Sequence, residues 1–258
     1  MHTERTGSGR SLVLVPGVGA TTATWGAVRT GLSAEREVVA LELPGFGRTP
    51  SLPGKVTVAA YADALEAHLR VEGLERADLV GSSLGARLVL EMARRGLGRS
   101  FVALDPGGFW SPAQQRIFGV SLSASVALVR ALRPALPALL STPVGRTALL
   151  AQLSARPWAL DGAFAAAEVR ALADSPGALP AIRALASGPL QEGAAAGTLP
   201  GPVLMVWGRR DLVTPPGTSR LAGERFPDAR IEVWDACGHF PHWDQPQRTL
   251  TTVLAATA

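Results

Sequence analysis

The fold of this chain is decided by the segment Ala77-Asp78-Leu79-Val80-Gly81-Ser82-Ser83-Leu84-Gly85-Ala86-Arg87-Leu88-Val89-Leu90-Glu91-Met92-Ala93. An apolar run typical of a buried strand leads into a G-x-S-x-G pattern, and a helix-like pattern follows directly. A serine can stand at the apex of so sharp a strand-to-helix turn only where the residues two before and two after it lack bulk. We therefore expect a nucleophile elbow that exposes the Ser83 hydroxyl over a helix N-terminus.

A nucleophilic serine needs an imidazole to take its proton, and the chain has four histidines. His2 lies in a polar N-terminal tail, and His68 lies in a helical run where a surface or packing role is expected. His239 and His242 follow the strand-like run 230–234, at the carboxyl edge of a sheet where ligands bind. His242 stands next to the start of the last helix, so we favour His239 as the base.

The imidazole in turn needs a carboxylate that fixes its tautomer. Val203–Trp207 is a near-continuous apolar run typical of a strand buried on both faces, and the turn after it ends at Asp211. Asp105 follows the apolar run 101–104 and is the rival, although a turn or cap role before Pro106 also explains it. We favour Asp211 as the acid.

The order Ser83, Asp211, His239 around such an elbow resembles the α/β-hydrolase superfamily over nearly the whole chain. Three further segments resemble the loop after the family's fourth strand, its acid loop and its histidine loop; they are Pro44-Gly45-Phe46-Gly47-Arg48-Thr49, Trp207-Gly208-Arg209-Arg210-Asp211 with Pro215, and Gly238-His239-Phe240-Pro241-His242 with Pro246. The resemblance implies the α/β-hydrolase fold and an esterase-like Ser-Asp-His triad. It does not specify a substrate.

The resemblance also implies an oxyanion hole made by two backbone N–H groups. One belongs to Leu84, directly after the serine, and by motif match the other belongs to Val18 in the loop after the first core strand. Pro16 stands where the family usually has a histidine. A backbone donor does not require that histidine, but the support of the loop must differ.

Strand and helix patterns alternate along most of the chain. Strands are expected at 11–15, 38–43, 77–81, 101–104, 203–207 and 230–234, and helices at 24–32, 58–71, 86–95, 217–225 and 246–256. Such alternation predicts an α/β fold with a mostly parallel central sheet and helices on both faces.

The interval 107–198 breaks this alternation, because it is rich in Ala, Leu and Pro with almost no strand signal. Helices are expected at 121–132, 147–156, 162–173 and 181–186, with Asp161 capping the third. We therefore expect a core domain of residues 1–106 and 199–258 and a helical lid of residues 107–198 over the carboxyl edge of the sheet.

The substrate pocket is expected to include the lid residues Trp110 and Trp158, and Phe240 beside the base. The Pro-interrupted lid helices show no extended apolar stripe suited to a lipid interface. We therefore expect small to medium apolar acyl groups to be preferred over long-chain lipids.

Composition excludes several classes of protein. The chain has 258 residues, 47% hydrophobic and 18% charged, which suits one large α/β domain. The formal net charge is +4 without a dense basic run or a nucleic-acid module, so no nucleic-acid partner is expected. Neither a phosphate-cradling loop nor metal-ligand spacing is present, so we expect no cofactor and no metal.

The longest apolar region, 120–140, is interrupted by Arg130 and Arg133 and by two prolines, which argues against a membrane span. No secretory signal pattern is visible, and the single cysteine, Cys237, cannot form an internal disulfide. These features lead us to expect a cytoplasmic protein. The sequence leaves its oligomeric state open.

The hypothesis from sequence is a cofactor-free serine hydrolase, carboxylesterase-like, that cleaves a carboxylic ester or related acyl compound through an acyl-enzyme, with a small molecule as its substrate. The same triad serves C–C bond hydrolases, lactonases, thioesterases and perhydrolases, and a ligand sensor with slow hydrolysis is also compatible with it. Epoxide and haloalkane chemistry in this family uses an aspartate nucleophile, and Ser83 occupies that place.

Overall fold

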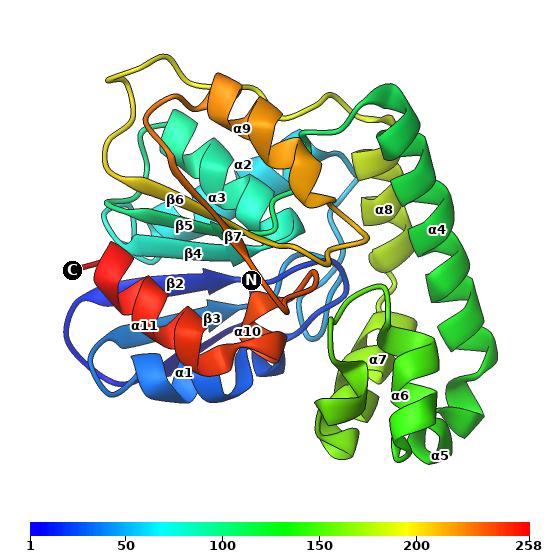
Figure 1. Ribbon diagram of the computed structural model, residues 1–258. Coiled ribbons are helices and arrows are strands. Elements are labelled where there is room, and N and C mark those ends of the chain that lie inside the picture. The colour runs from blue at the N-terminus through cyan, green and yellow to red at the C-terminus, as the bar shows by residue number, and fades with distance from the viewer.

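Seven strands form one sheet in the order β1-β3-β2-β4-β5-β6-β7 in the computed structural model, which describes residues 1–258 (Figure 1). The strands are β1 (Thr3–Thr6), β2 (Ser11–Val15), β3 (Glu37–Leu41), β4 (Asp78–Ser82), β5 (Phe101–Leu104), β6 (Val203–Gly208) and β7 (Arg230–Trp234). All neighbours are parallel except β1, which pairs antiparallel with β3. The α/β-hydrolase fold and its mostly parallel sheet are confirmed.

The N-terminal segment was expected to be a polar tail, and this expectation is wrong. Residues Thr3–Thr6 form the edge strand β1, in which Thr3 pairs with Leu41 and Thr6 with Val38. The strand is short, polar and only partly buried. Its sequence therefore lacks the apolar alternation by which a strand is recognised.

Helices cover both faces of the sheet (Figure 1). One face carries α1 (Gly26–Leu32), α10 (Pro241–Asp244) and α11 (Pro246–Ala256); the other carries α2 (Val58–Val71), α3 (Leu84–Arg94) and α9 (Ser219–Arg225). Leu12 and Leu14 pack into the apolar cluster of the first face, and Val13 and Val15 into that of the second. Because both faces are buried, the strands appear in the sequence as continuous apolar runs.

Five helices and their connections lie between β5 and β6, and we call them the inserted helices. They are α4 (Pro112–Ala131), α5 (Leu136–Leu140), α6 (Pro143–Leu150), α7 (Gly162–Asp174) and α8 (Ala178–Ser187). Figure 1 shows them beyond the carboxyl ends of the strands. Part of this segment has a small apolar cluster of its own, which includes Leu140, Leu150 and Val169.

Helix α4 begins well before the predicted start at Ser121. Ser111 and Gln114 form a reciprocal capping box, and Pro112 occupies the first turn, where its missing N–H costs nothing. The short α5 was not predicted. The expected cap of α7 is confirmed, because the Asp161 side chain accepts a hydrogen bond from the N–H of Phe164 at 2.8 Å.

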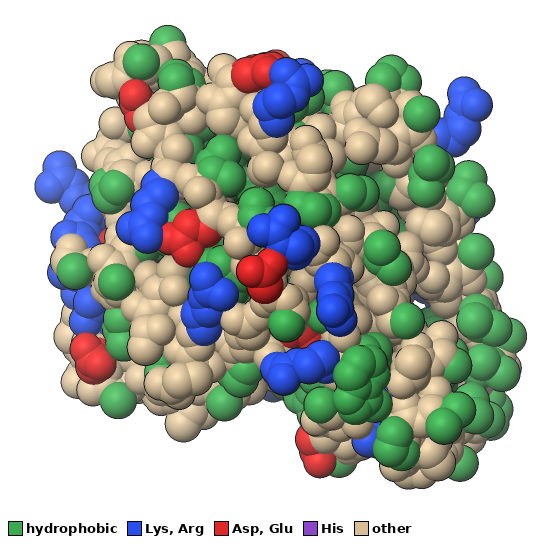
Figure 2. All heavy atoms as spheres, in the orientation of Figure 1, with side chains coloured by type: hydrophobic (Ala, Val, Ile, Leu, Met, Phe, Trp, Pro, Cys, Tyr) green, Lys and Arg blue, Asp and Glu red, His purple; other side chains and the backbone are tan.

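The longer α4 exposes large apolar side chains. Ile117, Val120 and Leu128 are 64%, 67% and 50% exposed, and Figure 2 shows hydrophobic side chains along this side of the molecule. The expectation that the lid lacks an extended apolar stripe is therefore wrong. The predicted helix began at Ser121 and so did not include Ile117 and Val120. No single helix is long and apolar enough to cross a membrane. Helix α4 and the segment Arg133–Leu140, which meet at a bend of 69°, together have the length and apolar composition of a span.

Candidate active site

Ser83 stands in a strained turn between β4 and α3. Its φ of 55° and ψ of −114° lie in a region that residues with side chains rarely adopt. A Cβ at Gly81 would come within 2.3 Å of the Gly85 carbonyl oxygen, and one at Gly85 within 2.0 Å of the Val15 carbonyl oxygen. Both glycines are therefore required by the close approach of backbone to backbone, as the G-x-S-x-G pattern predicts.

A chain of hydrogen bonds connects Ser83 to a buried carboxylate. The Ser83 Oγ lies 2.8 Å from His239 Nε2, and His239 Nδ1 lies 2.9 Å from Asp211 Oδ2. His239 and Asp211 are each 2% exposed. The structure thus brings the three predicted residues together at the carboxyl ends of β4, β6 and β7, in the geometry by which an imidazole can accept the serine proton.

Asp211 is held by its own loop, so that its carboxylate faces the histidine. Its Oδ1 accepts hydrogen bonds from the N–H groups of Val213, at 2.7 Å, and Thr214, at 3.0 Å, and its Oδ2 accepts one from the Thr214 hydroxyl. Burial alone would raise the pKa of Asp211, but attraction to His239 and the hydrogen bonds from His239 and Thr214 keep that pKa below its usual value. The carboxyl group of Asp211 is therefore ionised near neutral pH.

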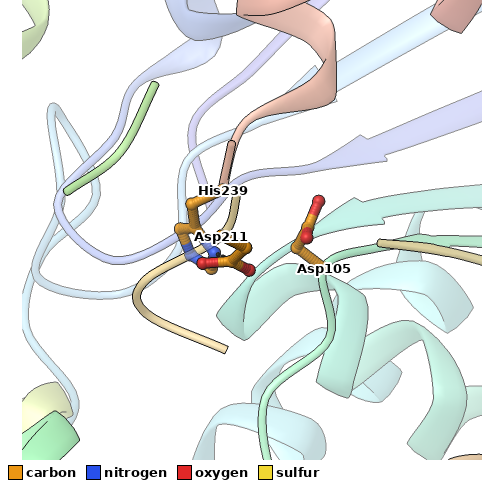
Figure 3. A group of neighbouring side chains, drawn as sticks. All are labelled: Asp105, Asp211 and His239. Carbon is orange, nitrogen blue, oxygen red and sulfur yellow. Dashed lines mark hydrogen bonds and ion pairs between the residues drawn. The ribbon is translucent and has the colours of Figure 1, made fainter. Parts of the chain in front are cut away.

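Asp105, the rival acid, lies next to this pair without joining it (Figure 3). One of its carboxyl oxygens accepts the Gly208 N–H at 2.8 Å, and the other has no partner. Burial raises the pKa of Asp105 well above its usual value, and repulsion by Asp211 raises it further. The protonated form of Asp105 is thus favoured beside the ionised Asp211.

Asp105, Asp211 and His239 also form a group whose possible ligand atoms lie within 4.8 Å of one another. The fit to a metal ion is poor, because the Nδ1 of His239 is already engaged by Asp211 and Asp105 favours its protonated form. A cation would have to replace the hydrogen bond that orients the imidazole.

The other histidines and the cysteine lie away from Ser83 or face elsewhere. His242 is buried with its ring 4.7 Å from that of Trp25, and burial lowers its pKa to about 3, so it is a neutral packing group. His68 lies on α2, and burial lowers its pKa too. Cys237 is a buried free thiol whose pKa is raised by burial, which disfavours the reactive thiolate.

The two residues expected to provide the oxyanion hole lie on either side of the elbow. Leu84 is the first residue of α3, so its N–H has no acceptor within the helix. Val18 lines the same cavity as Ser83, and the loop before it passes so close that a Cβ at Gly17 would lie 3.2 Å from the Ser83 Cβ. This placement supports the expectation.

The Ser83 hydroxyl opens into a cavity lined by 19 residues, 13 of them hydrophobic. The sheet loops and the inserted helices both contribute; the lining is Val18, Gly19, Ala20, Ser83, Phe118, Leu122, Ser125, Val129, Leu149, Leu150, Gln152, Leu153, Glu168, Val169, Leu172, Val213, His239, Phe240 and Trp243. Such an apolar cleft with few polar groups is typical of a small-molecule site.

Phe240 lines this cavity as expected, but Trp110 and Trp158 do not. Trp110 is 2% exposed and stacks on the lining residue Phe118, with ring centroids 4.6 Å apart, but is not itself part of the lining. Trp158 is 50% exposed on the short 3-10 helix Pro157–Ala159. The expected preference for small to medium acyl groups rested on Trp110 and Trp158 in the pocket and on the absence of an extended apolar stripe. The structure supports neither observation.

Sequence reasoning missed most of the lining from α4 and α7. Phe118, Leu122, Ser125 and Val129 recur at helical spacing on α4, and this spacing is the signal that could have found them. Only Phe118 lies before the predicted helix start. Glu168 gave no comparable signal, because one acid in an alanine-rich helix is typical of a solvated face.

Comparison with known proteins agrees with this geometry. The protein-family model described as "Alpha/beta hydrolase family" matches residues 12–252 of this chain. The chain is 28% identical to an uncharacterized protein of Mycobacterium tuberculosis, over 96% of this chain and 75% of that one, and 28% identical to the pimeloyl-[acyl-carrier protein] methyl ester esterase of Chromobacterium violaceum, over 96% and 94%. Among solved structures, a putative lipase of Acinetobacter baumannii superposes with a TM-score of 0.77 at 19% identity, covering 98% of this chain and 85% of that one.

Proposed function

Because the chain belongs to the alpha/beta hydrolase family, we propose that it is a serine hydrolase that cleaves a carboxylic ester or related acyl compound through an acyl-enzyme. The observation that carries this proposal is the unbroken chain of hydrogen bonds from Ser83 through His239 to Asp211. The pimeloyl ester esterase, similar along almost its whole length, acts on an ester by its name and supports the choice of bond.

In this mechanism the Ser83 Oγ attacks the substrate carbonyl while His239 Nε2 takes its proton. Asp211 holds the imidazole in the tautomer with a proton on Nδ1 and stabilises the positive charge that the ring acquires. The imidazolium then gives its proton to the leaving alcohol, and the acyl group stays on Ser83. A water molecule, activated by the same imidazole, attacks the acyl-enzyme and releases the acid.

The negative oxygen of each tetrahedral intermediate is bound by the N–H groups of Val18 and Leu84. These donors are backbone groups of a tight loop and of a helix N-terminus, so they need little reorganisation as charge develops. The helix dipole of α3 favours the anion as well. Pro16 takes the place of the family's usual histidine without removing either donor.

The inserted helices act as a lid, with a core domain of residues 1–106 and 199–258 and a lid of residues 107–198. What supports this division is the lining of the cavity that contains Ser83, to which α4, α6 and α7 contribute Phe118, Leu149 and Leu172. An apolar cover excludes water and strengthens the electrostatic interactions of the triad.

Two measurements test the proposal. A fluorophosphonate probe is expected to label wild-type protein on Ser83, and a panel of p-nitrophenyl esters from acetate to palmitate is expected to be turned over many times per second. Absence of both labelling and turnover would contradict a serine hydrolase. Labelling with a single turnover and tight product binding would instead support the ligand sensor.

A further inference from the structure

Glu168 is the only acidic side chain that lines the cavity of Ser83. It lies on α7. Leu172, one turn further on, contacts Gly19 in the loop after β2. Phe164, one turn before, packs against Trp243 with ring centroids 5.5 Å apart. Glu168 itself is 6% exposed. A carboxyl group is thus enclosed in the same apolar space as the nucleophile.

The surroundings of Glu168 contain no cation to neutralise it. No arginine or lysine lines the cavity, and Glu168 makes no ion pair. The neighbouring hydroxyl of Thr24 lies close enough to favour the charged form, and this hydroxyl also accepts a hydrogen bond from the Trp243 Nε1 at 3.2 Å. Buried acids are ordinarily paired with a cation, so one that has only a neutral hydroxyl beside it within a ligand cavity needs a reason.

The other polar side chains of the lining are already satisfied. Ser125 donates a hydrogen bond to Gln152 at 3.0 Å, and Gln152 donates one to Ser121 at 3.1 Å. Ser83 and His239 are bound to each other. Of the polar groups that a substrate could meet, Glu168 is the one that lacks a strong partner.

Leaving this carboxyl desolvated is costly, and burial raises its pKa to about 7. A substrate with only apolar groups would add to that cost by removing any remaining water. A substrate that brings a hydrogen-bond donor would offset it, because hydrogen bonds to charged groups are stronger than those between neutral groups.

We propose that Glu168 determines substrate specificity by accepting a hydrogen bond from a donor, a hydroxyl or an ammonium, carried by the substrate beyond its scissile acyl bond. This inference rests on the proposed hydrolase function and narrows it. It assigns the lid a polar recognition role within an otherwise apolar cavity. The natural substrate is then a hydroxylated or amine-bearing acyl compound rather than a plain fatty ester.

The test compares p-nitrophenyl esters of straight-chain acids from propanoate to hexanoate, each ending in a methyl, a hydroxyl or an ammonium group. In the wild type we expect at least one chain length at which a donor-ended ester has a higher kcat/KM than its methyl-ended match. Glu168→Gln should lower kcat/KM for the ammonium ester about tenfold or more. It should lower the value for the hydroxyl ester less, because an amide oxygen still accepts, and leave the methyl ester unchanged or improved.

The matched control is Glu224→Gln, which makes the same change at an exposed position on α9. It should alter none of the ratios. If Glu168→Gln lowers kcat/KM equally for all three esters, Glu168 only supports the packing of α7 and the proposal is wrong. An ammonium preference without a hydroxyl preference, or the reverse, identifies which donor the substrate carries.

Binding provides a readout that does not depend on turnover. Hexylamine, hexan-1-ol and hexanoate are titrated calorimetrically into the Ser83→Ala protein and into the Ser83→Ala, Glu168→Gln protein. Tighter binding of hexylamine or hexanol than of hexanoate, lost with Glu168→Gln, supports the proposal even if no ester is hydrolysed and the hydrolase function fails. Equal binding of the three ligands to both proteins overturns it.

Discussion

Asp105 and Asp211 end two neighbouring parallel strands and lie side by side, yet only Asp211 is hydrogen-bonded to His239. The two carboxyl groups are driven apart in pKa, one raised by burial and by its neighbour, the other lowered by the imidazole. The ionised form is thus favoured at Asp211 and the protonated form at Asp105, because their partners differ.

Asp211→Asn should therefore reduce kcat by about 10⁴, since the imidazole loses the anion that holds its tautomer. Asp105→Asn should reduce kcat less than about tenfold, because Asp105 makes no hydrogen bond to His239 and its burial favours the protonated form, which a neutral amide resembles. Steady-state kinetics on one ester, with circular dichroism to verify folding, compares them. A larger loss at Asp105 would move the triad acid to that residue.

Ser83→Ala should fold and lose about 10⁴ to 10⁶ in kcat, with His239→Ala almost as severe. The reason is that nucleophile and base act as a unit, so removal of either stops acyl transfer. Active-site titration with a fluorophosphonate checks that residual activity does not come from a contaminant. Retention of a tenth of the wild-type rate in Ser83→Ala would disprove the assignment.

Gly85→Ala should destabilise the fold by more than about 3 kcal/mol, since the added methyl meets the Val15 carbonyl oxygen at 2.0 Å and a backbone atom cannot rotate away. Gly217→Ala is the control, because a Cβ there meets nothing within 4 Å. Urea unfolding of the two variants measures the difference. Equal midpoints would mean that the elbow is looser than its geometry indicates.

Acyl-chain preference should follow the residues that line the cavity. Phe118→Ala enlarges the apolar space opposite Ser83, so the optimum of kcat/KM among p-nitrophenyl esters should move to longer chains. Trp158→Ala removes an exposed ring outside the lining and should leave the optimum in place. A shift caused by Trp158→Ala alone would show that the inserted helices are arranged differently around the cavity in solution.

Glu168 should make stability depend on pH. Its pKa rises from 4.5 in the unfolded chain to about 7 in the fold, so the folded state binds its proton more tightly and stability falls as pH rises through this range. Glu168→Gln removes this dependence. Its stability relative to wild type should therefore increase by up to about 3 kcal/mol between pH 4.5 and pH 8.

Urea titrations of both proteins across that range measure the Glu168 effect. A difference in stability that stays flat with pH would mean that Glu168 is solvated in the folded state.

Local signals explain how much of the fold and site could be predicted from sequence. The elbow needs glycines at two fixed positions, and strands buried on both faces need continuous apolar runs. From these two signals the sequence alone predicts that Ser83, Asp211 and His239 lie at one edge of the sheet. These features depend on covalent neighbours and on period, which a sequence displays directly.

The missed features depend on partners that are distant in sequence. Strand β1 exists through backbone pairing with β3, which its polar residues do not reveal. Trp110 and Trp158 look alike in an Ala- and Leu-rich segment, but only packing decides that one stacks on Phe118 and the other faces solvent. Glu168 is distinguished only by what surrounds it.

The inserted helices leave the sheet after β5 and return at β6, and these two strands are paired neighbours, with Leu104 opposite Val206. An insertion between adjacent strand ends can lengthen, shrink or be exchanged without breaking a single strand pairing. Natural selection can therefore vary which molecules are admitted while the catalytic loops stay in place. In such an architecture, the reaction and the substrate preference can evolve on separate parts of the chain.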